Sequence, residues 1–416
     1  MTPQIEQRIE QIRRGEVPEG YKKTKVGIIP VEWKENELGK YISEYRELSN
    51  DISQYPVYSS SRKGLLLQSE YYDNRESVET NVGYRVVPQG YVTYRHMSDD
   101  DVFHFNINNT LGLVLVSSEY PVFNAKKNAC RDYVIPFINT MPRFRYYCRT
   151  QKMGGTRTRL YFKNLCKFIM AFPPLAEQEK IAEVLETQDR VISLCEKKVE
   201  ELKKLKKAFL QKMFPKPGAT VPEWRFPGFT DTWEPCKFGE FLSEFCLKTK
   251  TEDEYPLLSS TNKGMESRSG RVSGESNVGY KIIDNGDVVL SPQNLWLGNI
   301  NINSIGKGIV SPSYKTFKIL KIESSFIHPQ LRTHHLLNAY KDASTQGASV
   351  VRRNLEPDMF FEIRIMAPSK PEQRKIGSLF AHLDNLITLH QRKCDEEKQK
   401  KKALMQLLLT GIVRAV

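Results

Sequence analysis

Asn81-Val82-Gly83-Tyr84 recurs unchanged as Asn277-Val278-Gly279-Tyr280, and this second occurrence decides the organisation of the chain. Matching residues extend in order on both sides of it, and the offset between them stays between 194 and 200 positions. The matches include Trp33 with Trp233, Ser59-Ser60 with Ser259-Ser260, Lys63-Gly64 with Lys263-Gly264, Tyr120 with Tyr314, and Glu177-Gln178 with Glu372-Gln373. Ordered matches at a nearly constant offset indicate that one structural unit is present twice.

Composition favours a globular protein with an anionic partner. The 416 residues suggest two or three domains, and 39% hydrophobic with 27% charged residues is ordinary for a chain that forms a core. The formal net charge is +13. Such a surplus attracts polyanions, because each Lys or Arg that contacts a phosphate releases condensed counterions. Nucleic acid is therefore the first partner to consider; the alternative is that the surplus is solvated helix surface.

The cysteines and the apolar runs indicate the cellular compartment in which the protein is expected. Seven cysteines occur without a CxxC pair or regular spacing, which favours a reducing compartment over a disulfide framework or a zinc site. Residues 1–14 lack the apolar region of a signal peptide, and no run approaches about 18 apolar residues. We expect a cytoplasmic protein without a membrane partner.

Each half has the same internal order, which predicts an α+β fold. Short β-rich runs at 84–87, 91–94 and 113–116 alternate with Gly, Pro, Asn and Ser, and counterparts lie at 280–283, 287–290 and 316–319. A proline boundary and a long helical segment follow in each half. The predicted segments are an N-terminal helix and first mixed α/β domain at 1–172, a central helix at 173–215, a second mixed domain at 216–367 and a C-terminal helix at 368–416.

The two long helical segments share a stripe of mostly apolar positions in alternating steps of four and three. A sustained repeat of this kind is buried best against another helix of the same kind. We therefore expect the two segments to pair as an antiparallel coiled coil that joins the two domains, with the charged remainder as a solvated face. The predicted packing residues are Ile181, Leu185, Ile192, Leu202, Phe209, Ile376, Phe380, Leu383, Ile387 and Leu404.

The first residues form a further predicted helix. Ile5, Ile9 and Ile12 fall on one helical face that ends at Gly15. One hypothesis is that residues 1–14 pack beside the C-terminal helix, which a crosslink from residue 9 to residues 404–412 would test.

Four stretches carry a resemblance to a known family: Pro-Pro-Leu-Ala-Glu-Gln-Glu-Lys-Ile at 173–181, Lys-Lys-Ala-Phe-Leu-Gln-Lys-Met-Phe-Pro at 206–215, Val-Pro-Glu-Trp-Arg-Phe-Pro-Gly-Phe at 221–229, and Leu-Leu-Leu-Thr-Gly-Ile-Val-Arg at 407–414. With two globular units that alternate with two long helices, the chain resembles the specificity subunit of type I restriction-modification systems over nearly its whole length. The start of the second helix departs from the usual pattern, with Pro-Ser-Lys-Pro-Glu-Gln at 368–373.

The resemblance implies a division of labour. Each globular unit would be a target recognition domain that reads one half of a split, asymmetric site in double-stranded DNA. The helices would fix the spacing between the half-sites and bind two methyltransferase subunits, which use S-adenosylmethionine to modify adenine N6. Two restriction subunits would supply ATP-driven translocation and Mg²⁺-dependent cleavage. No cofactor is expected on this chain itself.

The motifs of catalysis are missing from the sequence. It contains no Asn/Asp-Pro-Pro-Tyr/Phe methyltransferase motif, no GxxxxGK[ST] phosphate loop and no HExxH metal motif. Asp99-Asp100-Asp101 could mimic a metal site, but solubility of a loop explains it better. We therefore predict no catalytic or metal-ligating residues. Two alternatives stay open: a single-chain nuclease or methyltransferase, and a coiled-coil interaction protein or transcriptional regulator.

The duplication also suggests which residues would read DNA. Positions that match between the halves should hold the fold or contact phosphate, and differing positions nearby should read bases. Arg62 stands against Asn262; Arg suits guanine and Asn suits adenine, each contributing roughly 1–3 kcal/mol of discrimination. The alternative is an ordinary surface loop. The candidates are Ser60, Arg62, Lys63, Arg95, His96, Arg157 and Arg159 in the first half, and Ser260, Asn262, Lys263, Gln293, Asn294, Arg352 and Arg353 in the second.

Overall fold

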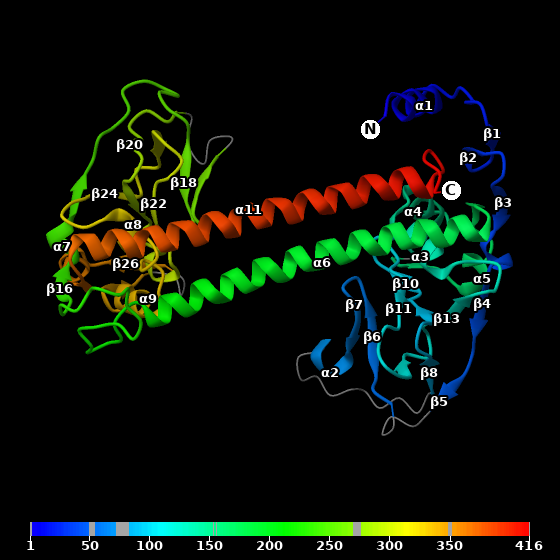
Figure 1. Ribbon diagram of the computed structural model, residues 1–416, viewed down its shortest axis with the longest axis horizontal. Coiled ribbons are helices and arrows are strands. Elements are labelled where there is room, and N and C mark those ends of the chain that lie inside the picture. Colours follow the sequence, from blue (N-terminus) through cyan, green and yellow to red (C-terminus); the bar gives the residue numbers. More distant parts are fainter. Residues whose placement is uncertain are drawn as a thin grey trace. The chain divides into compact units, whose positions relative to one another are not determined.

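The computed structural model describes residues 2–49, 55–71, 83–152, 154, 156–268, 276–347 and 352–415. It has two compact units. Unit 1 comprises residues 1–194 with 394–416, and unit 2 comprises residues 195–393. The boundaries cut across the two long helices, α6 (Leu175–Lys212) and α11 (Lys370–Leu409), so each unit contains one end of each helix (Figure 1).

Unit 1 is built mainly from short strands. Apart from its parts of α6 and α11, its elements are α1 (Pro3–Arg13), β1 (Tyr21–Thr24), β2 (Gly27–Pro30), β3 (Lys34–Glu37), η1 (Leu38–Lys40), β4 (Ile42–Tyr45), β5 (Leu48–Ser49), β6 (Tyr58–Ser61), β7 (Gly64–Leu67), α2 (Gln68–Tyr71), β8 (Tyr84–Val87), β9 (Val92–Thr93), β10 (Met97–Ser98), β11 (Asn106–Ile107), β12 (Val114–Val116), β13 (Val122–Ala125), α3 (Arg131–Thr140), α4 (Pro142–Arg149), β14 (Thr158–Arg159), α5 (Phe162–Leu165) and β15 (Ile169–Phe172).

Unit 2 repeats this order with small differences. Its elements between the long helices are β16 (Glu234–Lys237), α7 (Phe238–Phe241), β17 (Leu242–Phe245), β18 (Leu258–Ser260), β19 (Met265–Ser267), β20 (Lys281–Ile283), β21 (Val288–Leu290), η2 (Leu295–Leu297), β22 (Ile300–Ile302), β23 (Gly308–Val310), β24 (Lys315–Ile319), α8 (Ser324–Ile327), α9 (His334–Asp342), β25 (Ser344–Gln346), β26 (Arg353–Leu355), α10 (Pro357–Phe361) and β27 (Arg364–Ala367).

The central antiparallel sheet of each unit has the same order and register. It runs β11-β9-β13-β4 in unit 1 and β22-β21-β24-β17 in unit 2. Phe123 of β13 lies opposite Val92 and Glu44, and Phe317 of β24 lies opposite Val288 and Glu244. Since one-residue slips move every side chain to the other face, this agreement shows that the duplication extends to the strand pairing. The α+β content predicted from the sequence is confirmed.

A large aromatic side chain is enclosed at the centre of each core. Trp33 in unit 1 and Trp233 in unit 2 are both almost fully buried. Trp33 meets the ring of Tyr133 edge-on, and Trp233 packs against Phe214 and Phe326. These cores also take in the ends of the long helices, so each sheet is fixed to α6 and α11 by apolar burial.

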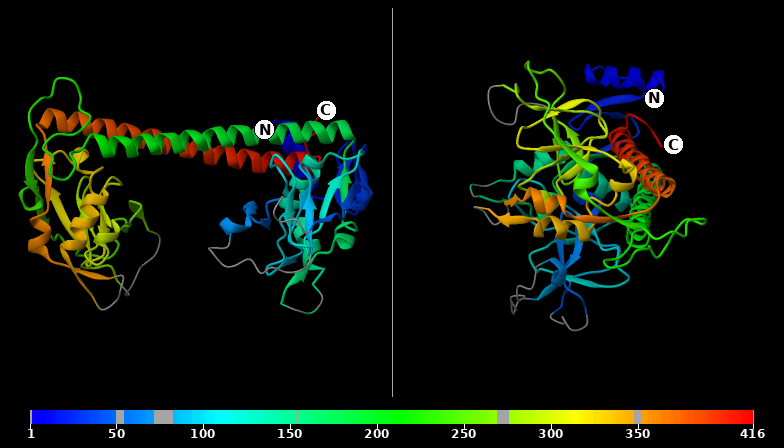
Figure 2. Two further views of the ribbon diagram at one scale, coloured as in Figure 1. Left: turned by 90° about the horizontal axis from the view of Figure 1, so that it is seen from below. Right: turned by 90° about the vertical axis from the view of Figure 1, so that its left-hand side faces the viewer.

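Within unit 1 the two long helices run antiparallel and side by side (Figures 1 and 2). Ile181 and Leu185 near the start of α6 share one apolar cluster with residues near the end of α11. Further along α6, the Gln188 amide donates to the Glu397 carboxylate at 2.8 Å, and Asp189 pairs with Lys401 at 2.6 Å. Polar residues on the stripe are thus accommodated by partners on the facing helix.

The same pairing is found within unit 2. Phe214 near the end of α6 packs against Phe380 near the start of α11, with ring centroids 5.6 Å apart. Lys206, a polar position on the stripe, pairs with Asp384 at 2.5 Å. Of the ten predicted packing residues, seven are buried and the other three, Phe209, Ile387 and Leu404, are partly buried.

The repeated Glu-Gln pair closes the start of each long helix. Gln178 donates to the Pro173 carbonyl and accepts from the Cys130 amide, which joins the first turn of α6 to α3. In unit 2, Gln373 makes the matching bonds to the Pro368 carbonyl and the Glu323 amide. These buried amides explain why the pair occurs twice in the sequence.

Helix α1 contacts the chain just after α11, all within unit 1. The Arg8 guanidinium donates to the Ile412 carbonyl at 2.8 Å, and the Tyr21 hydroxyl donates to the Gly411 carbonyl at 2.8 Å. We hypothesised a contact between the N-terminal helix and residues 404–412. The bond from Arg8 to Ile412, the last residue of that range, supports it. Throughout the part of the chain that the structure describes, each helix is too short or too polar to traverse a lipid bilayer.

Candidate nucleic-acid interface

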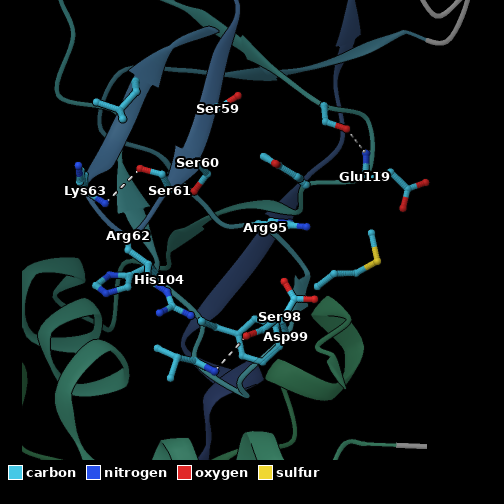
Figure 3. A pocket seen from close by; sticks show the side chains of 16 residues that line it. Ser59, Ser60, Ser61, Arg62, Lys63, Arg95, Ser98, Asp99, His104 and Glu119 are labelled. Carbon is cyan, nitrogen blue, oxygen red and sulfur yellow. Dashed lines mark hydrogen bonds between the residues drawn. The ribbon is translucent and has the colours of Figure 1, made fainter. Parts of the chain in front are cut away.

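Two concave surfaces lie at matched positions in the two units. The first, of about 890 Å³, lies between the β6–β7 turn and residues 95–104 of the loop that follows β9, and residues 117–120 complete its wall (Figure 3). The second, of about 500 Å³, lies between the β18–β19 turn and residues 294–299 of the loop that follows β21, with Tyr314 beside them. The duplicated turn around residues 59–64 and 259–264 is therefore one wall of a hollow in both units.

An asparagine from the central sheet holds each turn in place. In unit 1 the Asn106 amide donates to the Ser60 hydroxyl and the Ser61 carbonyl, both at 2.8 Å. In unit 2 the Asn301 amide donates to the Ser260 hydroxyl at 2.7 Å and the Thr261 carbonyl at 2.8 Å. The two networks have the same atoms in the same roles.

The matched serines therefore shape the turn. Ser60 is 6% exposed and Ser260 is 1% exposed, so their hydroxyls are used inside the protein. The sequence left phosphate contact and loop shape open as roles for these two serines, and their hydrogen bonds to Asn106 and Asn301 support loop shape.

In each turn, a hydroxyl residue before the tip and a glycine after it hold the two tip residues in an exposed position. The Ser61 hydroxyl accepts from the Lys63 amide at 3.1 Å and donates to the Gly64 carbonyl at 3.0 Å. Thr261 makes the same two bonds to residues 263 and 264 in unit 2. Gly64 and Gly264 have φ of 117° and 153°, which residues with a side chain rarely adopt. The tips of the two turns, Arg62-Lys63 and Asn262-Lys263, are exposed as a result.

The tip of the first turn makes an electrostatic contact across the hollow. Arg62 pairs with Asp100 in the loop after β10, and both side chains are about half exposed. The hydrogen bond from Arg62 is the largest cause that lowers the pKa of the Asp100 carboxyl, and a hydrogen bond from Ser98 lowers it further. The guanidinium is thereby held over the hollow, with Arg95 exposed on the same lining.

The predicted arginines before β14 lie beside the same loop. Arg157 pairs with Asp99 through Nε and Oδ1 at 2.8 Å, and Arg159 is exposed on β14 opposite Met97. The structure thus brings Arg62 and Arg157, far apart in the sequence, to two neighbouring carboxylates. Gly155, two positions before Arg157, falls outside the described residues.

His96 lies inside unit 1. It is 4% exposed, its Nε2 lies 3.4 Å from Glu119, and its ring stacks with Tyr161. Burial lowers the pKa of His96, and its Nδ1 has no hydrogen-bond partner. We predicted that His96 contacts DNA, but its side chain is buried and supports the loop from inside. Its neighbour Arg95 lines the hollow.

In unit 2 the predicted residues divide between the hollow and a hairpin. Asn262 and Asn294 both line the second hollow. The Arg353 guanidinium donates to the Ser344 hydroxyl and carbonyl at 2.8 and 2.7 Å, so it anchors the β25–β26 hairpin. Gln293 is exposed and its carbonyl accepts from the Arg353 amide; Arg352 is exposed, and residues 348–351 lie outside the described residues.

Sequence reasoning missed the asparagines that support the turns. The tripeptide Asn-Ile-Asn occurs at 106–108 and again at 301–303, within the range of offsets of the other matches. The second asparagine of each copy is also structural, since Asn108 and Asn303 close the loops that follow them. A systematic comparison of the two halves would have found both. His104 and Arg268, which line the first and second hollows, carried no such signal.

Among the residues that the structure describes, no group of three or more His, Cys, Asp or Glu side chains is placed to hold a metal ion. The hollows are lined by hydroxyl, amide and cationic side chains with a few carboxylates, and by apolar side chains such as Phe103 and Leu297. Such linings hydrogen-bond polar, anionic ligands, including base edges and phosphates.

The chain matches a known family in both halves. The type I restriction modification DNA specificity domain matches residues 30–204 and again residues 231–398. The chain therefore belongs to this family, and it is a specificity subunit of the type I restriction-modification class, with one DNA recognition domain in each half.

Individual relatives agree with this assignment. The chain is 24% identical to a putative type I restriction enzyme MjaX specificity subunit of Methanocaldococcus jannaschii, over 95% of this chain and 97% of the relative. It is 22% identical to the type I restriction enzyme EcoDI specificity subunit of Escherichia coli, over 86% and 84% of the two chains.

Solved structures share the fold. The S subunit of a type I restriction-modification system from M. genitalium superposes with a TM-score of 0.59 at 12% identity, over 90% of this chain and 96% of the other. A chain from a study of complex assembly and conformational transition in the type I R-M system gives a TM-score of 0.52 at 15% identity, over 92% and 99%.

Proposed function

We propose that units 1 and 2 each read one half of a split, asymmetric site in double-stranded DNA, through the two matched hollows. The observation that carries the proposal is that one scaffold presents different side chains at the same place. The asparagine, serine and glycine of the turn recur in both units, whereas the exposed tip carries Arg62 in one and Asn262 in the other. A constant support with a variable tip is what two readers of different sequences require.

Chemistry assigns roles to the tip residues. Arg62 would donate two hydrogen bonds to guanine O6 and N7, and Asn262 would pair with adenine N6 and N7. Lys63 and Lys263, exposed and identical, would contact phosphates, which position the protein without reading sequence. Arg95 and Asn294 stand on the linings of the two hollows and are the next candidates for base contacts.

We further propose that α6 and α11 form an antiparallel coiled coil that sets the number of unread base pairs between the half-sites. The contacts between the helices within each unit support the pairing. Exposed apolar residues remain on α6, among them Leu194 and Leu205, and on α11 at Leu389. They offer surface to two methyltransferase subunits, whose recruitment to the site would allow adenine N6 methylation.

In this proposal the chain is a non-catalytic subunit. S-adenosylmethionine would be bound by the methyltransferase subunits, and ATP and Mg²⁺ would be used by two restriction subunits that cleave DNA. The relatives bear the name of specificity subunits of type I restriction enzymes, which supports this division.

The experiment is genome-wide mapping of N6-methyladenine in cells that express the chain with its methyltransferase subunit. The expected result is methylation at one split motif with a fixed gap, absent from cells without the chain. Asn262→Ala should relax one half of the motif and Arg62→Ala the other. Methylation that is unchanged by removal of the chain would contradict the proposal.

A further inference from the structure

Consecutive carboxylates of one loop face arginines from separate parts of unit 1. Asp99 pairs with Arg157, which precedes β14, and Asp100 pairs with Arg62 at the tip of the β6–β7 turn. The loop follows β10 and borders the first hollow, where Figure 3 shows Asp99 and Arg62 around the same opening.

The third carboxylate completes the set. Asp101 Oδ2 lies 3.9 Å from Nε of Arg149, at the end of α4, and Asp101 also accepts from the Thr158 hydroxyl. Its backbone has φ of 62°, in the left-handed region that Asp and Asn tolerate better than most residues. The loop is thus turned so that each of its three carboxylates has a cationic partner.

Unit 2 lacks this arrangement at the matched place. Residues 94–105, between β9 and β11, contain three carboxylates, whereas residues 291–299, between β21 and β22, contain no charged side chain. Sequence considerations explained the acidic run as loop solubility. Solubility does not account for its position opposite three arginines at the edge of a hollow in one unit only.

The exposure of the three arginines argues against a main role for their ion pairs in folding, although Asp101 is 24% exposed. The three arginine side chains are 51 to 60% exposed. Exposed ion pairs sit in water-like dielectric and contribute little to folding stability. Such pairs are therefore easily exchanged for another anion, and the phosphate backbone of DNA is an anion of the right kind.

We propose that the Asp99–Asp101 loop is an intramolecular counterion for Arg62, Arg149 and Arg157, and that it suppresses binding of unit 1 to DNA of the wrong sequence. This inference rests on the proposed function. DNA of the wrong sequence is held by phosphate contacts alone, so it must displace the carboxylates from all three arginines. DNA of the correct sequence is held by base contacts as well, for instance at Arg62, so it needs to displace fewer of the carboxylates. The carboxylates thus widen the difference in affinity between right and wrong sequences.

The test is the triple variant Asp99→Asn, Asp100→Asn and Asp101→Asn in the complex of the chain with its methyltransferase subunit. Asn keeps the size of the side chain and tolerates the backbone of residue 101. Affinity is measured for a duplex that carries the split site and for a mixed-sequence duplex that lacks it. We expect affinity for the mixed-sequence duplex to rise about tenfold and affinity for the site to rise less.

The salt dependence gives a second readout. For the mixed-sequence duplex, the slope of log affinity against log salt should steepen by about one for each arginine that is released to contact a phosphate. This readout reports charge exchange, so it does not depend on small changes in the fraction of folded protein.

The control removes the same number of negative charges elsewhere in unit 1. Glu6→Gln, Glu10→Gln and Glu16→Gln act on exposed residues in and just after α1. If the Asp variant and this control raise mixed-sequence binding equally, or neither does, the inference is wrong although the wild type still selects its site. A wild-type complex without any sequence preference would instead overturn the proposed function and the inference with it.

Discussion

Arg414 forms a two-point ion pair with Glu177, from Nε to Oε1 at 2.6 Å and from Nη2 to Oε2 at 2.8 Å. Glu177 stands in the first turn of α6, and Arg414 follows the end of α11. Unit 2 contains the same relationship with the helices exchanged: Arg225, after α6, pairs with Glu372, in the first turn of α11, through two bonds of 2.7 Å. In each unit, the repeated glutamate thus links the start of one long helix to the segment that follows the other long helix through an ion pair.

Loss of either arginine should destabilise its unit. Glu372 is 1% exposed and Glu177 is 5% exposed, so removal of the partner leaves a buried carboxylate. Glu177 keeps a hydrogen bond from the Trp33 indole at 3.0 Å. We expect Arg225→Ala to cost about 3 kcal/mol of unfolding free energy and Arg414→Ala somewhat less. Urea denaturation measures both.

The matched control for these arginines is Arg190→Ala. Arg190 pairs with Glu186 one turn away on α6, and both side chains are more than 60% exposed. Its loss should cost no more than about 0.5 kcal/mol. Equal effects of all three substitutions would show that burial of the carboxylate is not what matters.

The asparagines beneath the turns should matter for one half-site each. Asn301→Ala leaves the buried Ser260 hydroxyl and the Thr261 carbonyl without a donor, at a cost of about 1–3 kcal/mol. We expect it to weaken recognition of the half-site read by unit 2, and Asn106→Ala to do the same for unit 1. Methylation of substrates altered in one half-site at a time separates the two. Asn338→Ala, at an exposed position, is the control.

Lys63 and Arg62 are neighbours on the turn but should behave differently. Lys63→Ala should weaken binding to all sequences and reduce the slope of log affinity against log salt by about one. Arg62→Ala should reduce discrimination at one base pair by about 1–3 kcal/mol. Titrations with site variants at several salt concentrations distinguish these patterns. The assignment of roles fails if Lys63→Ala changes the preferred base.

The stability of unit 1 should fall in mild acid because of His96. Burial lowers the pKa of this residue from 6.5, although Glu119 partly opposes the shift. The unfolded chain therefore binds the proton more readily, and stability is lost as the pH falls below about 6.5 towards the pKa of the folded state. Thermal unfolding of His96→Gln should depend less on pH in that window than the wild type does. His335→Gln, at an exposed position, should leave the dependence unchanged.

The duplication made much of the architecture predictable. Matched residues located the strands in both halves, because a repeated pattern of apolar runs and turns fixes the same pairing twice. The stripe on the long helices identified residues that are buried or partly buried, such as Ile181 and Phe380. The prediction succeeded because a periodic apolar face on a helix is stable only when it is buried against another element.

The site was less accessible to sequence reasoning. Ser60 and Ser260 were chosen because they match between the halves, and His96 because it follows a predicted strand, but burial depends on contacts with distant parts of the chain. Asp99 and Arg157 are 58 positions apart, and no periodicity signals that they meet. What the repeat did locate is the turn itself, since its glycine and hydroxyl residues recur.

The division into units has a consequence for the order of biosynthesis. Unit 2 is a continuous segment, residues 195–393, whereas unit 1 needs residues 394–416 as well as residues 1–194. During translation, residues 195–393 leave the ribosome before residues 394–416. The strands of unit 1 can therefore pack against the end of α11, and Glu177 can pair with Arg414, only after all of unit 2 has emerged. Domains fold as units once their residues are available, so the half made second is the first that can be complete. Until then Glu177 and the apolar residues around it lack the partners that the end of α11 and Arg414 supply.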